Sequence, residues 1–163
     1  MLEKPVNYGG AFSVPPARLR RRALRACGPR VISAQQIRSM LEACQKSPQL
    51  TNLRAMMLLG INAGLNNAEA SRLRIGEIDL EAGVLDKPRD KTEEPRRAML
   101  WPATIEAIKA ALTRREKLYK KRPLSDELQQ VVFVTKHRRP YTSTSSSGKP
   151  LDSVGLEFRS LAK

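Results

Sequence analysis

The 163-residue chain is long enough for one domain, or for one domain and an arm, and its 40% hydrophobic residues can form a core. Lys and Arg total 30 against 16 Asp and Glu, and this net charge of +14 favours a polyanionic partner over a membrane surface or a merely solvated face. The single histidine, His137, and the two cysteines, Cys27 and Cys44, are too few for a zinc site or a disulfide framework. Because no signal peptide or membrane span is visible, we expect a cytoplasmic protein.

Residues 1–30 are predicted to form a basic arm or linker. Several prolines and glycines discourage regular structure there, although residues 17–26 allow one short helix. Its arginines predict contacts to phosphates, while the alternative is a linker whose arginines stay in water. The arginines that carry this prediction are Arg18, Arg20, Arg21, Arg22 and Arg25.

Helical structure is predicted to begin at Ser33, with Gln36 three residues later in the spacing of a capping box. An apolar stripe at i, i+3, i+4 and i+7 then follows one helix face, formed by Ile37, Met40, Leu41 and Cys44. A second helix, from about Leu50 to Ala63, is apolar on most sides and is therefore expected to be central. The residues that predict its burial are Leu53, Met56, Met57, Leu58, Leu59 and Ile61. Gly64 is expected to end it, and a short helix follows over about residues 67–73.

The next segment predicts a β-hairpin. Val84 and Leu85 form the first strand, residues 88–95 form a polar turn, and residues 96–101 form the second strand. On that second strand Arg97, Met99 and Trp101 are expected to share one face.

Pro102 is predicted to start a long helix that runs to about Lys121, because proline is favoured at the first helical position. Its apolar stripe consists of Ile105, Ile108, Leu112 and Leu118. Residues 131–134 predict another strand and residues 142–148 a flexible loop. Asp152 is expected to cap a last helix that carries Val154, Leu156, Phe158 and Leu161.

Three motifs are specific enough to indicate a family. Residues 58–73 resemble the "GLR-x-x-E" box of tyrosine recombinases of the phage-integrase type, and residues 78–80 resemble the "DID" segment of that family. Lys91-Thr92, Arg96-Arg97 and Leu100 resemble the hairpin pattern "KTG-x-x-R-x-x-PL". Trp101-Pro102 and residues 132–135 continue the likeness, which is greatest to integrase-type proteins of planctomycete bacteria.

This resemblance covers about residues 31–163. It implies an α+β, mostly helical fold with a small β-hairpin sheet, namely the N-terminal part of an integrase-like catalytic domain behind the basic arm. It also implies DNA recombination and integration by strand exchange, with duplex DNA as the partner, a nucleoid-associated location, and no metal or other cofactor.

The family chemistry is the attack of a tyrosine hydroxyl on a DNA phosphodiester, which needs fixed cations around the phosphoryl oxygens. The resemblance places Lys91 as the proton donor to the leaving oxygen and Glu69 as the acidic support of the first catalytic arginine. Asn66 stands at the position of that arginine, and a neutral amide cannot form its charge-assisted clamp. The further DNA-contact residues expected on the hairpin are Arg89, Arg96 and Arg97.

The His-x-x-Arg box and the nucleophilic tyrosine of the family are expected beyond the last helix. None of Tyr8, Tyr119 and Tyr141 is placed like that nucleophile, so we expect an incomplete and inactive fragment that binds DNA. Self-association on DNA, or pairing with a complementing C-terminal segment, would fit this interpretation. Two alternatives stay open: a non-catalytic DNA-binding regulatory or architectural module, and a basic RNA-associated protein.

Overall fold

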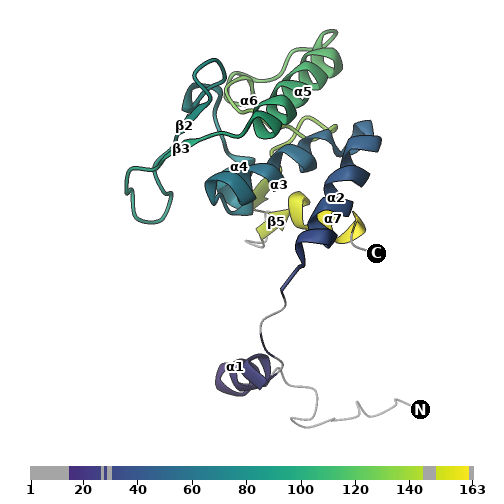
Figure 1. Ribbon diagram of the computed structural model, residues 1–163. Coiled ribbons are helices and arrows are strands. Elements are labelled where there is room, and N and C mark those ends of the chain that lie inside the picture. Colours follow the sequence, from purple (N-terminus) through teal and green to yellow (C-terminus); the bar gives the residue numbers. More distant parts are fainter. Residues whose placement is uncertain (1–14, 27, 29–30, 145–149, 162–163) are drawn as a thin grey trace, which may run out of the picture. The chain divides into compact units, whose positions relative to one another are not determined.

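The computed structural model describes residues 15–26, 28, 31–144 and 150–161 (Figure 1). The chain divides into two compact units, Met1–Ala34 and Gln35–Lys163. The first unit contains helix α1 (Ala17–Ala26), which confirms the short helix predicted there. The irregular structure predicted for residues 1–14 lies outside the described residues.

The second unit is built around helix α3 (Thr51–Ala63), which follows α2 (Ala34–Lys46) and the short helix η2 (Pro48–Leu50). The prediction of a central, buried helix is confirmed, since Leu53, Leu58 and Leu59 are all buried. Two residues of the predicted set are less buried: Met57 is half-buried, and Ile61 is 45% exposed near the end of the helix. Gly64 ends α3 in the left-handed conformation with φ of 67°, as expected for a C-terminal glycine.

A short helix and a small sheet come next. Helix α4 (Asn67–Ser71) and the turn η3 (Ile75–Glu77) lead into strands β1 (Ile78–Asp79), β2 (Val84–Asp86) and β3 (Arg97–Met99). The strands form an antiparallel sheet in the order β1-β2-β3, with Val84 opposite Met99. The predicted hairpin is therefore confirmed. The sheet also contains β1 as a third strand, which was not predicted because it has only two residues.

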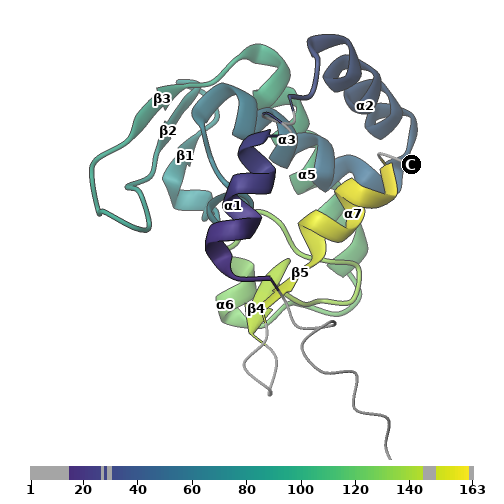
Figure 2. The same ribbon diagram turned by 90° about the horizontal axis from the view of Figure 1, so that it is seen from below.

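Helix α5 (Pro102–Tyr119) begins at the predicted proline and lies against α3 in both views (Figures 1 and 2). Thr104, Ala107, Ile108 and Ala111 face the core. Leu118 was predicted to extend the apolar stripe, but its side chain is 47% exposed. The short helix α6 (Asp126–Gln129) follows.

The strand predicted over residues 131–134 is wrong. Val131 forms only an isolated bridge with Arg74, and the Val132 N–H donates to the carbonyl oxygen of Leu73 at 2.8 Å. Residues 132–134 are buried without a partner strand. An apolar run of this length looks the same in sequence whether it is a buried strand or a buried extended segment.

The loop predicted over residues 142–148 is wrong at its start. Strand β4 (Thr142–Thr144) pairs antiparallel with β5 (Pro150–Asp152), and residues 145–149 lie outside the described part. Helix α7 (Ser153–Leu161) begins after Asp152, whose Oδ1 accepts the Gly155 N–H at 3.0 Å, so the predicted cap is confirmed. Leu156 on this helix is 62% exposed. None of the described helices is both long and apolar enough to cross a membrane.

Candidate functional site

The buried carboxylate of Glu69 is the centre of the candidate site. At the start of α4, Asn66 and Glu69 form a reciprocal capping box: the Asn66 N–H donates to Oε2 of Glu69, and the Glu69 N–H donates to Oδ1 of Asn66, each at 3.0 Å. Asn66 therefore uses its side chain as a helix N-cap, a task for which asparagine is among the best residues. The resemblance places Asn66 at the position where the family has its first catalytic arginine.

Arg96 binds the same carboxylate from the hairpin. Its Nη2 lies 3.1 Å from Oε1 of Glu69 and its Nη1 lies 3.3 Å from Oε2, while Nε donates to the Lys87 carbonyl oxygen at 3.2 Å. Nη1 is also 3.5 Å from the Gly64 carbonyl oxygen. The side chains of Arg96 and Glu69 are only 11% and 8% exposed. The pair thus joins the residue before β3 to the N-terminus of α4 away from water.

These contacts keep Glu69 ionised. Burial alone would raise the pKa of its carboxyl group, but the Asn66 N–H, the Arg96 guanidinium and a backbone hydrogen bond from Asp90 together lower it below the ordinary value of 4.5. A negative charge at this point therefore persists at neutral pH and holds Arg96 in place.

Lys87 is a second anchor of the hairpin, and the sequence patterns did not indicate it. Its Nζ lies 3.2 Å from Oε1 of Glu77 and 3.1 Å from Oδ1 of Asp90, and the residue is 6% exposed. Its partners are ten residues upstream and three residues downstream. A lysine next to Pro88 in a polar turn is expected to be solvated. In the sequence, only the charges of Glu77 and Asp90 could have suggested that Lys87 is buried and ion-paired.

The segment between these anchors carries Lys91 in an exposed turn. Backbone hydrogen bonds close the turn, from Glu93 N to the Arg89 carbonyl oxygen at 2.8 Å and from Arg89 N to the Glu94 carbonyl oxygen at 3.0 Å. Glu93 has a positive φ of 55°, at the position where the family pattern "KTG" has glycine.

The face that Arg97, Met99 and Trp101 were predicted to share is confirmed, and it is exposed. Arg97, Met99 and Trp101 are exposed, and they alternate with half-buried Ala98 and buried Leu100. The structure thus brings Asn66, Glu69 and Arg96 into contact, while Lys91, Arg89 and Arg97 lie on the exposed side of the hairpin. The five predicted arginines of the arm belong to α1 in the other unit, whose position relative to the hairpin is not defined.

The two described tyrosines have their hydroxyl groups engaged. Tyr141 is 2% exposed, and its hydroxyl oxygen accepts a hydrogen bond from Nδ2 of Asn52 at 3.2 Å. Tyr119 donates to the Thr135 carbonyl oxygen at 2.6 Å. Burial raises the pKa of both hydroxyl groups. Three nearby arginines oppose the shift at Tyr119, whereas at Tyr141 Glu157 adds to it and the Asn52 hydrogen bond and Arg114 oppose it. Tyr8 lies outside the described residues.

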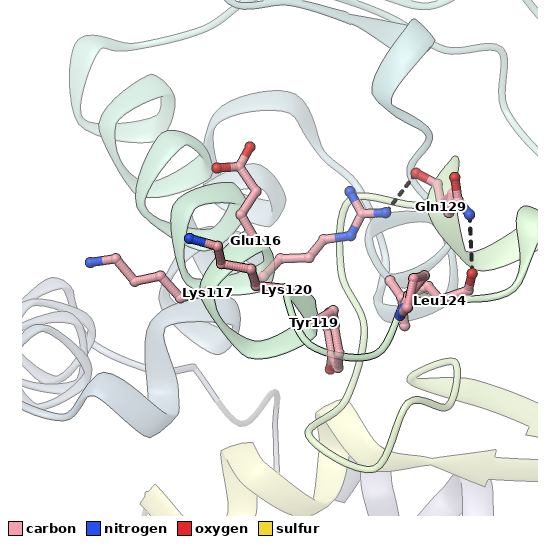
Figure 3. A pocket seen from close by; sticks show the side chains of 8 residues that line it. Glu116, Lys117, Tyr119, Lys120, Leu124 and Gln129 are labelled. Atoms are coloured by element: carbon pink, nitrogen blue, oxygen red, sulfur yellow. Dashed lines mark hydrogen bonds between the residues drawn. The ribbon is translucent and has the colours of Figure 1, made fainter.

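A surface cavity of about 600 Å³ lies between the end of α5 and α6. Nη2 of Arg115 donates there to the carbonyl oxygens of Leu128 and Gln129, at 3.0 and 2.6 Å. Lys117 and Lys120 extend away from Leu124 (Figure 3). Because Arg115 is occupied and the lysines do not converge, we assign no chemistry to this cavity.

Other reactive groups are sparse in the described part of the chain. Cys44 is a free, buried thiol whose pKa is raised to about 11 by burial, with Arg54 opposing the shift. Cys27 lies outside the described residues. Across the described ranges, no group of three His, Cys, Asp or Glu side chains could hold a metal ion.

The arrangement of helices around α3, with the small sheet leading into α5, is the fold of a tyrosine-recombinase catalytic domain. A crystal structure of XerA recombinase matches it with a TM-score of 0.59 and 17% sequence identity, over 82% of this chain and 42% of that one. The family model described as "Phage integrase family" matches residues 30–152, and the chain therefore belongs to the phage integrase family. The chain spans less than half of the XerA recombinase chain, and no curated protein matches it.

Proposed function

We propose that this chain binds duplex DNA through its hairpin and presents Lys91 to a scissile phosphate, as the proton donor of a tyrosine-recombinase site. The observation that carries the proposal is the setting of Lys91. It is exposed, yet its turn is held on one side by the buried Lys87, which pairs with the more exposed Glu77 and Asp90, and on the other side by the nearly buried pair of Arg96 with Glu69. A lysine on an anchored turn loses little freedom when it meets a phosphate.

Arg89 and Arg97 are the proposed phosphate contacts beside Lys91, because both are exposed on the hairpin. Arg96 is proposed as their support. A guanidinium has five N–H donors, and four of those of Arg96 point to Glu69, Lys87 and Gly64. One free donor cannot form the two-pronged contact with phosphate that arginine usually provides.

Asn66 limits the proposed chemistry. Without a cation at this position the transition state for phosphoryl transfer loses stabilisation, typically a factor of roughly 10²–10³ in rate. We therefore propose that these residues act mainly in DNA binding. Strand exchange is the reaction that their arrangement would support.

The proposal is tested by measuring the affinity of the full chain for labelled duplex DNA over a range of salt concentrations. Wild-type affinity should fall steeply with salt, and Lys91→Ala and Arg97→Ala should each reduce the slope of log affinity against log salt by about one. Lys109→Ala is the matched control, because Lys109 is exposed on α5 outside the hairpin. Affinity that ignores salt, or equal losses in Lys109→Ala and Lys91→Ala, would contradict the proposal.

A further inference from the structure

Helix α1 concentrates positive charge to an unusual degree. Its ten residues, ARLRRRALRA, include five arginines and no acidic residue. All five arginines are exposed, and none of them is ion-paired with another described residue. Charge of this density on one short helix needs either water or a polyanion around it.

The arginines are not spread evenly around the helix. With 3.6 residues per turn, Arg18, Arg21, Arg22 and Arg25 fall within an arc of about 100°, while Arg20 points roughly 150° from the middle of that arc. The four residues also line one surface hollow together with Leu19. One side of α1 is therefore an arginine face, and Arg20 belongs to the other side.

The arginine face matches a row of phosphates in length. At a rise of about 1.5 Å per residue, Arg18 and Arg25 are about 10 Å apart along the helix axis. One strand of duplex DNA has a phosphate about every 3.4 Å of its axis, so this length faces about three successive phosphates.

The same spacing places like charges where they repel one another along α1. Arg18 has like charges three and four residues on, at Arg21 and Arg22, and Arg25 has them three and four residues back. Like charges at these separations destabilise an isolated helix, and a helix of ten residues is marginal on its own. Phosphates along the arginine face would remove the repulsion that works against the helix.

We propose that α1 lies with Arg18, Arg21, Arg22 and Arg25 against the phosphate backbone of duplex DNA, and that Arg20 points away from it. The choice of DNA rests on the DNA-binding function proposed above, and the choice of residues rests on the geometry of α1. We assign the contact to the backbone, because the four exposed cations form one continuous face and most protein–DNA hydrogen bonds go to phosphate and sugar oxygens.

Arg21→Ala and Arg20→Ala form the matched pair for the test. They are neighbours, both are exposed, each removes one charge, and alanine preserves the helix. In the full chain, Arg21→Ala should weaken binding to duplex DNA several-fold and reduce the salt slope by about one, whereas Arg20→Ala should change neither. Replacing all four face residues with alanine should reduce the slope by about three.

The outcomes separate this inference from the proposed function. A wild-type protein whose DNA affinity ignores salt would overturn DNA binding itself. Salt-dependent wild-type binding with equal losses in Arg20→Ala and Arg21→Ala would overturn the arginine face and leave DNA binding standing. Tighter binding to duplex RNA of the same sequence would overturn DNA as the partner of α1.

Discussion

Arg96 and Glu69 are 27 residues apart in sequence, yet the guanidinium of one binds both carboxylate oxygens of the other, at 3.1 and 3.3 Å. The contact connects the end of the hairpin turn, just before β3, with the first turn of α4, where the Asn66 N–H donates to the same carboxylate. The position of the hairpin turn, and of Lys91 within it, therefore depends on an ion pair that is almost completely withdrawn from water.

Removal of one partner of this pair should be costly. Glu69→Ala leaves the Arg96 charge buried without its counter-ion, and we expect the free energy of unfolding in urea to fall by about 3 kcal/mol. Arg97→Ala, at the neighbouring exposed position, should change it by less than about 0.5 kcal/mol. The double variant Glu69→Ala/Arg96→Met should lose less than the sum of the two single changes, and strict additivity would show that the pair is not coupled.

The same pair predicts acid sensitivity. Because the pKa of Glu69 is lower in the folded state than in the unfolded chain, its ionised form contributes stability above the unfolded value, and that contribution is lost as the pH falls through the folded value. The stability of the wild type should therefore decline below about pH 4.5 more steeply than that of Glu69→Gln. Parallel pH profiles of the two proteins, measured by thermal unfolding, would contradict this.

Restoring the family residue at position 66 should destabilise the protein. Asn66→Arg removes the side-chain acceptor for the Glu69 N–H, and loss of an N-cap costs about 1 kcal/mol. Asn66→Asp retains an acceptor and should be nearly neutral, so it serves as the control. If Asn66→Arg and Asn66→Asp unfold at the same denaturant concentration, the cap contributes nothing.

Local patterns predicted most of the helices. Gly64 and Pro102 mark one helix end and one helix start, and the apolar spacing between such signals predicts α3 and α5 with small errors at their ends. Patterns failed where an element is too short to repeat its period several times. β1 has two residues and β4 has three, so neither shows the alternation that identifies a strand.

The sequence motifs indicated residues of the candidate site but not which of them are in contact. The motifs indicated Asn66, Glu69 and Lys91, yet the ion pair of Glu69 with Arg96 connects segments that only the folded chain brings together. Lys87 was missed for the same reason, since its two carboxylate partners lie in η3 and in the hairpin turn. Sequence spacing carries no information on such pairings unless a known pattern includes them.

Glu157 on α7 should make the protein less stable at neutral pH. Its Oε2 is buried without a hydrogen-bond partner, and burial raises the pKa of the carboxyl group although Tyr141, Arg114 and Lys136 oppose the shift. A folded pKa above the unfolded one means that stability is lost as the pH rises through the folded value.

Glu157→Gln should therefore raise the melting temperature at pH 7 and change it little at pH 4, because the neutral amide resembles the protonated acid. Glu116→Gln, an exposed change on α5, is the control and should have no effect at either pH. An equal effect of Glu157→Gln at both pH values would show that charge is not the cause.

Neither Tyr119 nor Tyr141 should form a covalent bond to DNA. Attack on a phosphodiester requires a hydroxyl that can approach the phosphorus atom and release its proton. The Tyr141 hydroxyl is buried and accepts a hydrogen bond from Asn52, and the Tyr119 hydroxyl donates to the Thr135 carbonyl oxygen. The pKa of each hydroxyl is raised, so the attacking phenolate is less populated. Asn66→Arg should not change this outcome, because an added cation can stabilise a transition state but cannot supply an attacking group.

The measurement is incubation of the wild type and Asn66→Arg with nicked duplex substrates, followed by a denaturing gel and peptide mapping of any protein–DNA adduct. Tyr119→Phe and Tyr141→Phe are the matched controls, since each removes one hydroxyl and keeps the ring. An adduct that maps to either tyrosine and disappears in the corresponding phenylalanine variant would show that the hydroxyl leaves its hydrogen bond and reaches the phosphate. Lys91 would then have to act together with Tyr119 or Tyr141 as the nucleophile. The interpretation of these two tyrosines as structural residues would be wrong.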